Sequence, residues 1–345
     1  VVGAVLAPSL LEVMGATHAV VSIGAGYTAL MLGGGVTVFL MFVINAAFRS
    51  AGDAAVAMRS LWLANLLNIA LAPCLIFGVG PFPRMGLLGA AVAMTGSRAV
   101  GVVYQLAMLL GGGRRVAVAR RHLVASARVV REIVRVGTPA TLQVLIETAS
   151  WLALVRIVAE YGDAALAGYT IAMRVVIFAL LPAWGLAAAS ATLVGQNLGA
   201  RKPDRARSSV WRIAGYNLVL LAPAGIVFFV APKLVVGLLT SDAATAAYAA
   251  DCLRIVAVGF LAFACGMVAM QSLNGAGDTR TPMVVNLASF WGFKLPLAWL
   301  LSGPLGWGPR GVFVAITAAY MVQSALAAAL LHRAGARWER SAAAP

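Results

Sequence analysis

Two short stretches of the chain, Ala51-Gly52-Asp53 and Ala276-Gly277-Asp278, repeat the same acidic turn 225 residues apart. A methionine follows each turn at the same distance, and a long apolar segment precedes each one. The same offset pairs further small residues: Gly34 with Gly259, Gly86 with Gly311, Ala90 with Ala315 and Ala93 with Ala318. This repetition indicates that one helical unit is used twice.

The composition around these turns is that of a membrane protein. Apolar residues make up 62% of the chain and charged residues 11%, against roughly 25% charged residues in soluble domains. A bilayer-spanning helix needs about 20 apolar residues. Segments that meet or approach this length lie at 20–48, 57–79, 86–110, 133–158, 164–196, 210–231, 244–273, 281–302 and 310–331, with a partial one at 1–14. We therefore predict an all-α polytopic membrane protein with nine full spans and one partial span.

The net charge of +15 is distributed unevenly between the connections. One alternate set holds only Arg84, Lys233 and Arg310, whereas most of the 26 basic residues lie in the other set. Basic loops stay in the cytoplasm, so we predict a multi-pass protein of a bacterial-type inner membrane with its basic loops and C-terminus cytoplasmic. We therefore expect the basic loops to face the lipid bilayer surface and not to bind nucleic acid.

The spans divide into two parallel repeats of six helices each. An even number of spans returns the chain to its starting side, which relates the halves by an axis along the membrane normal. We predict an N-terminal lobe at 1–110 with four of six helices, because the first two helices of the second repeat have no counterparts in the first. A basic cytoplasmic linker at 111–132, a six-helix C-terminal lobe at 133–332 and a cytoplasmic tail at 333–345 follow.

Motifs for enzymatic chemistry are missing from the sequence. None of the three lysines ends a glycine-rich phosphate loop, and no histidine begins a His-Glu-x-x-His motif. The three cysteines lie in apolar spans and suggest neither a disulfide nor a metal site. Gly275-Ala276-Gly277-Asp278 resembles an intramembrane protease motif, but no second intramembrane Asp could share its proton. We interpret Asp278 as a helix cap, and we expect no enzyme activity, cofactor or metal.

Charged residues inside spans are costly and are therefore candidates for function. Glu147 is the acidic residue nearest the middle of a span, and no Lys or Arg lies three or four residues from it. A carboxylate there can hold a proton or another cation, which is the minimum requirement for exchange transport. The structural alternative is a Glu147 that stays protonated or pairs with Arg174.

Other charged residues have simpler interpretations. Arg254 follows Asp251 by three residues and is expected to pair with it. Arg156 and Lys294 lie nearer span ends, from which a long side chain can reach the membrane surface. Arg98 has no local partner and could line a cavity or pair with another helix. The residues predicted to form an adaptable substrate cavity are Gln143, Trp151, Arg174, Trp184, Phe263 and Met267.

Several motifs resemble the multidrug and toxic compound extrusion (MATE) family of secondary transporters. The segment from Val194 to Asp204, with Gly195, Gln196 and Gly199, is similar to the cytoplasmic turn after the family's eighth helix. The segment from Asn274 to Pro282 and the turn with Gly52 and Asp53 resemble the matching turns of the two halves. We expect conformational roles for Gly52, Asp53, Gly195, Gln196, Gly199, Gly277, Asp278 and Pro282.

The resemblance implies a monomeric antiporter that exports small cationic or amphipathic organic compounds in exchange for Na⁺ or H⁺. Gly137-Thr138-Pro139 followed by Glu147 matches a seventh-helix pattern in which many members carry a cation-site glutamate. The sequence departs from the family at Phe263, where some members place an aspartate. Two alternatives stay open: a flippase for lipid-linked oligosaccharides, which would use Arg98, Arg156 and Arg174, and a non-transporting membrane scaffold.

Overall fold

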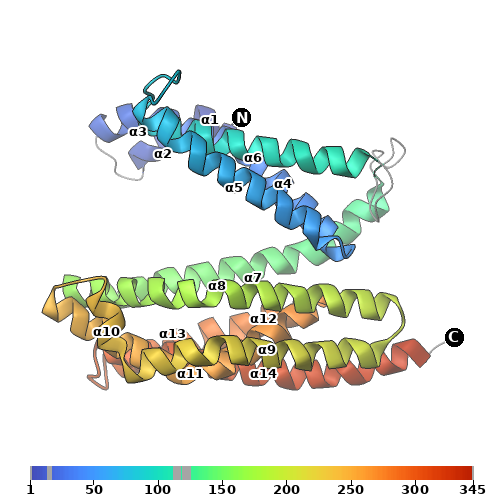
Figure 1. The fold of residues 1–345 in the computed structure, drawn as a ribbon. Coiled ribbons are helices and arrows are strands. Elements are labelled where there is room, and N and C mark those ends of the chain that lie inside the picture. The colour runs from blue at the N-terminus through green and yellow to red at the C-terminus, as the bar shows by residue number, and fades with distance from the viewer. Residues whose placement is uncertain (1, 14–17, 112–117, 119–125, 344–345) are drawn as a thin grey trace. The chain divides into compact units, whose positions relative to one another are not determined.

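The computed structural model describes residues 2–13, 18–111, 118 and 126–343, and within these residues the secondary structure is entirely helical (Figure 1). The chain divides into two compact units, Val1–Ala125 and Ser126–Pro345. Nine helical segments of the described residues are long and apolar enough to cross a bilayer, which confirms the predicted number of full spans. The chain is therefore an all-α multi-pass membrane protein.

The described residues of the first unit form six helices, of which α1 and α2 contact α3. They are α1 (Val2–Val5), α2 (Ala7–Val13), α3 (His18–Gly33), α4 (Gly35–Ser50), α5 (Ala54–Phe77) and α6 (Leu87–Leu110). Helices α3, α4 and α5 all contact α6. Phe48, Val56 and Val102 lie in the buried core between α4, α5 and α6. The short helices α1 and α2 occupy the region of the predicted partial span.

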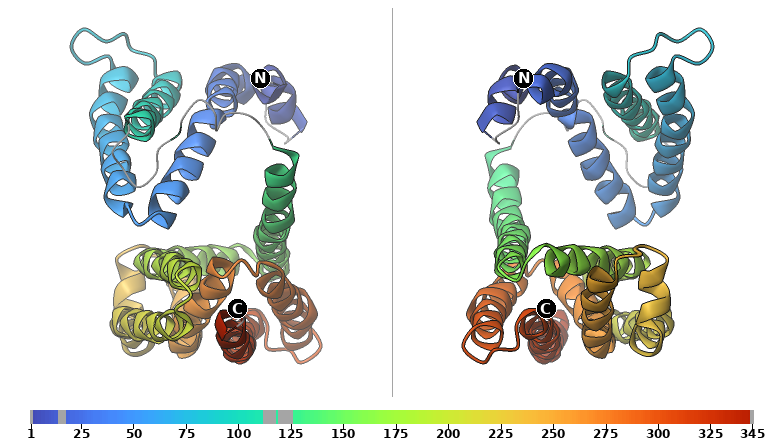
Figure 2. Two further views of the ribbon diagram at one scale, coloured as in Figure 1. Left: turned by 90° about the vertical axis from the view of Figure 1, so that its right-hand side faces the viewer. Right: turned by 90° about the vertical axis from the view of Figure 1, so that its left-hand side faces the viewer.

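The second unit is built around α11. Its elements are α7 (Ala127–Ala159), α8 (Asp163–Gly199), α9 (Pro203–Val230), α10 (Pro232–Gly237), α11 (Ala243–Gly275), α12 (Arg280–Asn286), the π-helix η2 (Leu287–Lys294), α13 (Leu295–Ser302) and α14 (Pro309–Ala343). Helix α11 packs against α8, α9 and α14, which run alongside it in the views of Figures 1 and 2. Its most apolar window is 61% buried, a larger share than in any other span of the described residues.

Glycines allow α11 to approach its neighbours closely. A Cβ atom on Gly275 would collide with the backbone of Ala191 in α8, and one on Gly266 would collide with Ser324 in α14. Small residues at such crossings let helices in a membrane gain van der Waals contact where hydrophobic exclusion from water is unavailable. The close packing of α8 and α14 on α11 therefore depends on the positions of these glycines in α11.

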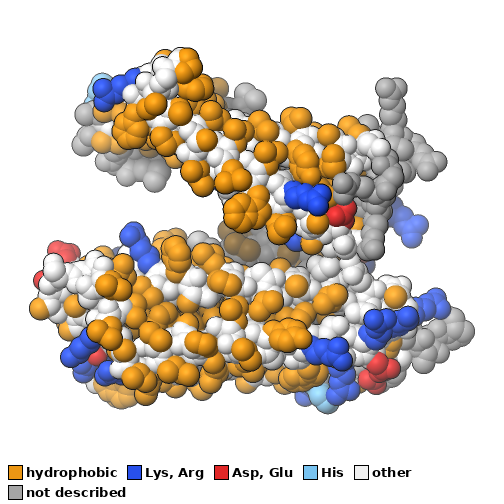
Figure 3. Space-filling model, in the orientation of Figure 1, with side chains coloured by type: hydrophobic (Ala, Val, Ile, Leu, Met, Phe, Trp, Pro, Cys, Tyr) orange, Lys and Arg blue, Asp and Glu red, His pale blue; other side chains and the backbone are white. Residues whose placement is uncertain are grey.

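The surface of the second unit suits a bilayer. On the face shown in Figure 3, hydrophobic side chains cover the middle of the helices and charged residues gather towards their two ends. Trp211, Phe229 and Val219 are among the large apolar side chains that are exposed. Hydrocarbon is the solvent in which such an apolar surface is stable.

The duplicated turns have the same backbone in both units. Gly52 and Gly277 adopt φ values of 83° and 84°, a region that only glycine enters without strain. The Asp53 N–H donates to Phe48 O at 2.9 Å, and the Asp278 N–H donates to Leu273 O at 3.1 Å. These bonds close the preceding helices α4 and α11 in the same way. The repeated turn predicted from the sequence is thus a repeated structure.

The register of the duplication changes after the turn. Gly34 packs on Thr95 in the first copy, and Gly259 packs on Thr317 in the second. The two glycines, which precede the turns, are 225 residues apart, whereas the two threonines in the last helices are 222 residues apart. Met85 and Gly86 N–H groups donate to Leu75 and Ile76, as Trp307 and Gly308 donate to Leu301 and Ser302. Gly86 therefore corresponds to Gly308, not to Gly311. The predicted pairs Gly86–Gly311, Ala90–Ala315 and Ala93–Ala318 are wrong because the second connection is shorter.

The π-helix η2 first shifts the register in the opposite direction, before the shorter connection reduces the offset. Leu75 corresponds to Leu301, an offset of 226, so the second copy has one more residue than the first between turn and helix end. A π-turn accommodates one residue more per turn than an α-turn. Helix α5 has no π segment, whereas its counterpart contains Leu287–Lys294. The additional residue is thereby absorbed inside the membrane-spanning helix.

Two predicted boundaries differ from the helices. Helix α7 begins at Ala127, inside the segment 111–132 assigned to a linker, and residues 112–117 and 119–125 of that segment lie outside the described residues. Helix α14 continues to Ala343, so the segment 333–345 is helical over most of its length. In both places the helix extends through basic residues beyond the apolar span.

Candidate functional site

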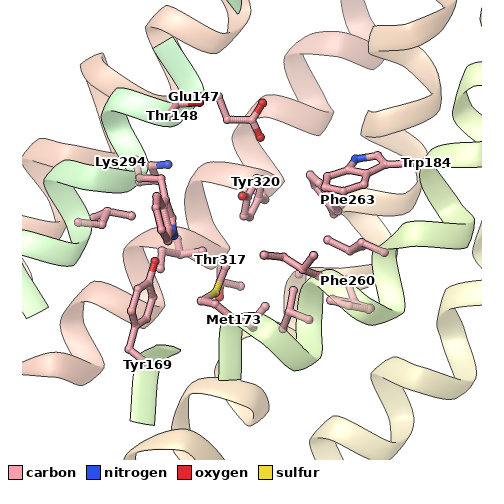
Figure 4. Close-up of a pocket in the computed structure, with 18 residues that line it drawn as sticks. Glu147, Thr148, Tyr169, Met173, Trp184, Phe260, Phe263, Lys294, Thr317 and Tyr320 are labelled. Atoms are coloured by element: carbon pink, nitrogen blue, oxygen red, sulfur yellow. The ribbon is translucent and has the colours of Figure 1, made fainter. Parts of the chain in front are cut away.

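A cavity of about 380 Å³ lies within the second unit, between α7, α8, α11, η2 and α14 (Figure 4). Its walls are mostly aromatic and aliphatic, with two charged side chains among them. The lining residues are Glu147, Thr148, Trp151, Leu154, Tyr169, Met173, Val176, Ile177, Leu180, Trp184, Val256, Gly259, Phe260, Phe263, Lys294, Ile316, Thr317 and Tyr320. A volume of this size with few polar groups is typical of a site for a small organic molecule.

Glu147 provides the negative charge of the cavity. It lies on α7, and Figure 4 shows its carboxylate extending from that helix across the edge of the cavity. The adjacent carbonyl of Ile146 accepts a hydrogen bond from Trp291 Nε1 at 3.1 Å. This bond holds the Glu147 turn of α7 against η2. Glu147 as a whole residue is exposed, and its carboxylate is among the groups that line the cavity.

Lys294 provides the positive charge. Its side chain is 3% exposed, and its Nζ atom lies 4.1 Å from the centroid of the Phe290 ring. The prediction that Lys294 reaches the membrane surface is therefore wrong. It lies inside the bundle because η2 packs against α7 and α14, so its side chain is directed at the cavity.

The two charges do not touch. No carboxylate among the described residues lies within 4.0 Å of the Lys294 ammonium, although Glu147 and Lys294 interact electrostatically across the cavity. The Phe290 ring supplies part of the stabilisation that a buried ammonium needs, through a cation–π contact. Arg174, which was the partner of Glu147 in the structural alternative, is exposed and does not line the cavity.

Aromatic rings connect the Lys294 side of the cavity to the opposite wall. Phe290 packs edge-on against Tyr320 with centroids 5.8 Å apart, and Tyr320 packs against Phe263 at 4.4 Å. Trp184 and Phe263 lie on the opposite side from Lys294 in Figure 4. The cavity therefore has a charged side and an aromatic side.

Three of the six predicted cavity residues line this space: Trp151, Trp184 and Phe263. Arg174 is exposed outside it, and Met267 is buried in the packing of α11. Gln143 lies elsewhere, because its Nε2 donates to Thr279 O at 2.9 Å and to Asn274 Oδ1 at 3.2 Å. Gln143, Arg174 and Met267 thus do not line this cavity, and their role in binding substrate stays a prediction.

The predicted turn residues occupy the helix ends. Asp278 Oδ1 accepts the Thr281 N–H at 3.0 Å, which confirms the capping interpretation of this acidic residue. Pro282 is buried in the first turn of α12. Gly195 faces the carbonyl of Gly275, so that α8 and α11 meet closely near their ends. Gly199 and Gln196 lie in the last turn of α8, where Arg201 takes a positive φ of 55°.

Two further charged residues differ from expectation. Asp251 pairs with Arg310 of α14 at 2.6 Å and not with Arg254, whose Nε donates to Phe229 O at 3.3 Å. The prediction failed because α14 brings a better-placed guanidinium to the carboxylate. Arg156 is exposed, and Arg98 is partly buried on α6 of the first unit.

Lys294, Tyr320 and Thr148 were not predicted to line the site. Lys294 carried a signal, because a lysine inside a span is rare, but its direction depends on the register that η2 sets. Tyr320 gave no signal, since an aromatic residue in an apolar helix is usually part of the packing. Within the described residues, no group of three His, Cys, Asp or Glu side chains is placed to hold a metal ion.

Comparisons with known proteins agree with the fold. The sequence profile of the MatE family matches residues 1–74 and 139–300. A probable multidrug resistance protein of Bacillus subtilis, YoeA, is 25% identical over 93% of this chain and 70% of its own length. A probable multidrug resistance protein NorM of Thermotoga maritima is 29% identical over 92% of this chain and 68% of its own. The crystal structure of a MATE protein in a bent conformation has a TM-score of 0.91 at 22% identity, covering 99% of this chain and 75% of that one.

Proposed function

The chain belongs to the MatE family of membrane transporters, and from this membership we propose that it exports amphipathic or cationic organic compounds from the cell. Transport would be secondary active antiport by alternating access, with Na⁺ or H⁺ as the coupling ion and without a bound cofactor. The names of the two relatives as multidrug resistance proteins support this substrate class. The proposed setting is an inner membrane, with the basic loops cytoplasmic and the protein acting as a monomer.

The observation that carries the proposal is the Glu147 carboxylate at the edge of an aromatic cavity. Trp151, Trp184 and Phe263 can hold a flat organic molecule, and ring faces attract organic cations. A carboxylate that binds a coupling ion in one conformational state of the transporter and releases it in the other links the movement of that ion to the movement of the substrate. When the substrate is uncharged, one coupling cation crossing about 100 mV supplies roughly 2.3 kcal/mol, which sustains an approximately fifty-fold substrate gradient.

Flipping of lipid-linked oligosaccharides is less well supported. Pyrophosphate would require several cationic side chains facing one cavity. Arg156 and Arg174 are exposed and lie outside the cavity of the second unit. Lys294 is the one Lys or Arg residue that lines this cavity. One buried ammonium beside a carboxylate is a poor match to a pyrophosphate group.

The test is the substitution Glu147→Gln, which removes the ionisable group and keeps the side-chain size. We expect the variant to reach the membrane and to lose gradient-driven efflux of ethidium, measured by fluorescence in proteoliposomes. Glu160→Gln is the matched control, since Glu160 is exposed at the end of the same helix and does not line the cavity. Efflux that survives Glu147→Gln at the control rate would contradict the coupling role.

A further inference from the structure

The titratable groups around Glu147 come from several elements. Helix η2 contributes Lys294, α8 contributes Tyr169 and α14 contributes Tyr320, all of which line the same cavity. The lining residues of α11 carry no ionisable group. Lys294 is thus the cation that the fold places opposite Glu147, and it comes from a helix 147 residues further along the chain.

The environment of Lys294 indicates that its positive charge acts on the cavity and that the side chain is not there only for packing. Burying an ammonium is costly unless another charge or ring compensates it. Phe290 compensates part of that cost, and the ammonium remains on the cavity wall without a carboxylate in contact. A lysine needed only for packing could be replaced by Met or Leu at lower cost.

We infer that Lys294 is a fixed counter-cation for Glu147 that keeps Na⁺ from binding at this carboxylate and leaves the proton as its exchange ion. This inference rests on the proposed coupling role of Glu147 and specifies its ion. Lys294 would act as a specificity-determining residue.

The difference between the two ions lies in what each needs besides the carboxylate. A proton forms a covalent O–H bond with one oxygen, whereas a hard metal cation needs several oxygen ligands at once. Glu147 is the single carboxylate lining the cavity, and the other side-chain oxygens of its lining residues are the neutral hydroxyls of Thr148, Tyr169, Thr317 and Tyr320. Repulsion from Lys294 then acts on a site with one anionic oxygen ligand group.

Organic cations are affected less by this repulsion than Na⁺. Their charge is spread over a large apolar body that can pack on the aromatic wall. Trp184 and Phe263 form that wall on the side opposite Lys294 (Figure 4). An exporter of such compounds can therefore contain a lysine in its cavity and still exclude the small metal ion.

The first experiment measures Na⁺ binding to the purified protein by titration calorimetry, with choline chloride keeping the ionic strength constant. We expect no Na⁺ binding at Glu147 in the wild type. Lys294→Met, which keeps the length of the side chain, should strengthen Na⁺ binding by at least about tenfold, because the repulsion between two nearby charges is removed. The double variant Glu147→Gln/Lys294→Met should lose this binding again.

Controls separate the effect of charge from that of packing. Lys294→Arg keeps the charge and should behave as the wild type, and Lys233→Met removes an exposed lysine at the start of α10. Na⁺ binding by the wild type that Glu147→Gln abolishes would overturn the inference. An unchanged Na⁺ affinity in folded Lys294→Met would do so as well. If Lys294→Met does not fold, the wild-type titration alone still decides.

The second experiment compares ethidium efflux driven by a proton gradient with efflux driven by a Na⁺ gradient, in the same proteoliposomes. The wild type should respond to the proton gradient alone, and Lys294→Met should gain a response to Na⁺. Wild-type efflux that needs Na⁺ would contradict the role of Lys294. Proton-driven efflux that ignores Glu147→Gln would instead contradict the proposed function, while the calorimetry still reports on Lys294 independently.

Discussion

In the first copy of the duplicated unit, Asn45 Oδ1 accepts hydrogen bonds from Gln105 Nε2 at 2.7 Å and Ser60 Oγ at 3.2 Å between buried helices. The corresponding residues of the second copy are Met270, Val285 and Ala327, all buried and apolar. The same three helices are thus joined by a polar network in one copy and by apolar packing in the other. The two copies therefore share the arrangement of these helices, while the buried side chains between the helices differ.

Nearer the cavity, both copies carry polar side chains. Lys294 and Tyr320 line it in the second copy, where the structural register places Asn68 and Arg98 in the first. The second copy also has a hydrogen bond from Gln323 Nε2 to Asn286 Oδ1, at positions occupied by Gly101 and Leu61 in the first. Polar groups therefore stabilise the helix packing in the first copy, while in the second they also face a cavity.

The largest expected effect tests whether η2 holds an additional residue. Deleting Gly292, which is exposed and has no side chain to lose, should convert η2 to an α-helix with the residue count of α5. Deleting the exposed Ala70 from α5, which contains no π segment, should instead rotate the rest of that helix by about 100° and prevent folding. Membrane yield and thermal unfolding in detergent measure both variants. Equal losses would refute the insertion.

An intermediate effect is expected from the buried network of the first copy. Gln105→Ala removes the Nε2 donor from Asn45 Oδ1 and Ser60 Oγ, and the 3.2 Å bond between these two residues is all that is left of the network. The loss of this buried donor should lower the free energy of unfolding by about 1–3 kcal/mol. The triple variant Asn45→Met/Ser60→Val/Gln105→Ala introduces the residues of the second copy. It should recover most of the loss, because no polar group is then left unsatisfied. A triple variant less stable than Gln105→Ala in thermal unfolding would show that the copies do not tolerate exchange of their cores.

The smallest effects concern the turns. Gly52→Ala and Gly277→Ala should each cost about 1–2 kcal/mol of stability, and by similar amounts, because both glycines have the same positive φ. Arg201 has a φ of 55° in the related turn after α8, so Arg201→Gly should raise the thermal midpoint slightly. Unequal effects of the two alanine substitutions in detergent unfolding would show that the surroundings, and not the turn geometry, determine the cost.

The sequence by itself determined the number of spans, the duplicated turn with its capping Asp278, and Glu147 as a charged residue to be explained. These features follow from local rules: apolar length, glycine conformations and the cost of charge in a bilayer. The same local rules failed for Arg254, because the partner of Asp251 was chosen by the packing of α14.

Only the tertiary structure decided what surrounds Glu147. Lys294 reaches the cavity through the contacts of η2 with α7 and α14, and one residue absorbed in a π-turn changes the direction of the side chains around it. Gln143, one turn before Glu147, donates to Thr279 O beside the second acidic turn and does not line the cavity. Periodicity shows which residues share a face of one helix. Which helix that face meets depends on the packing of segments far apart in the chain.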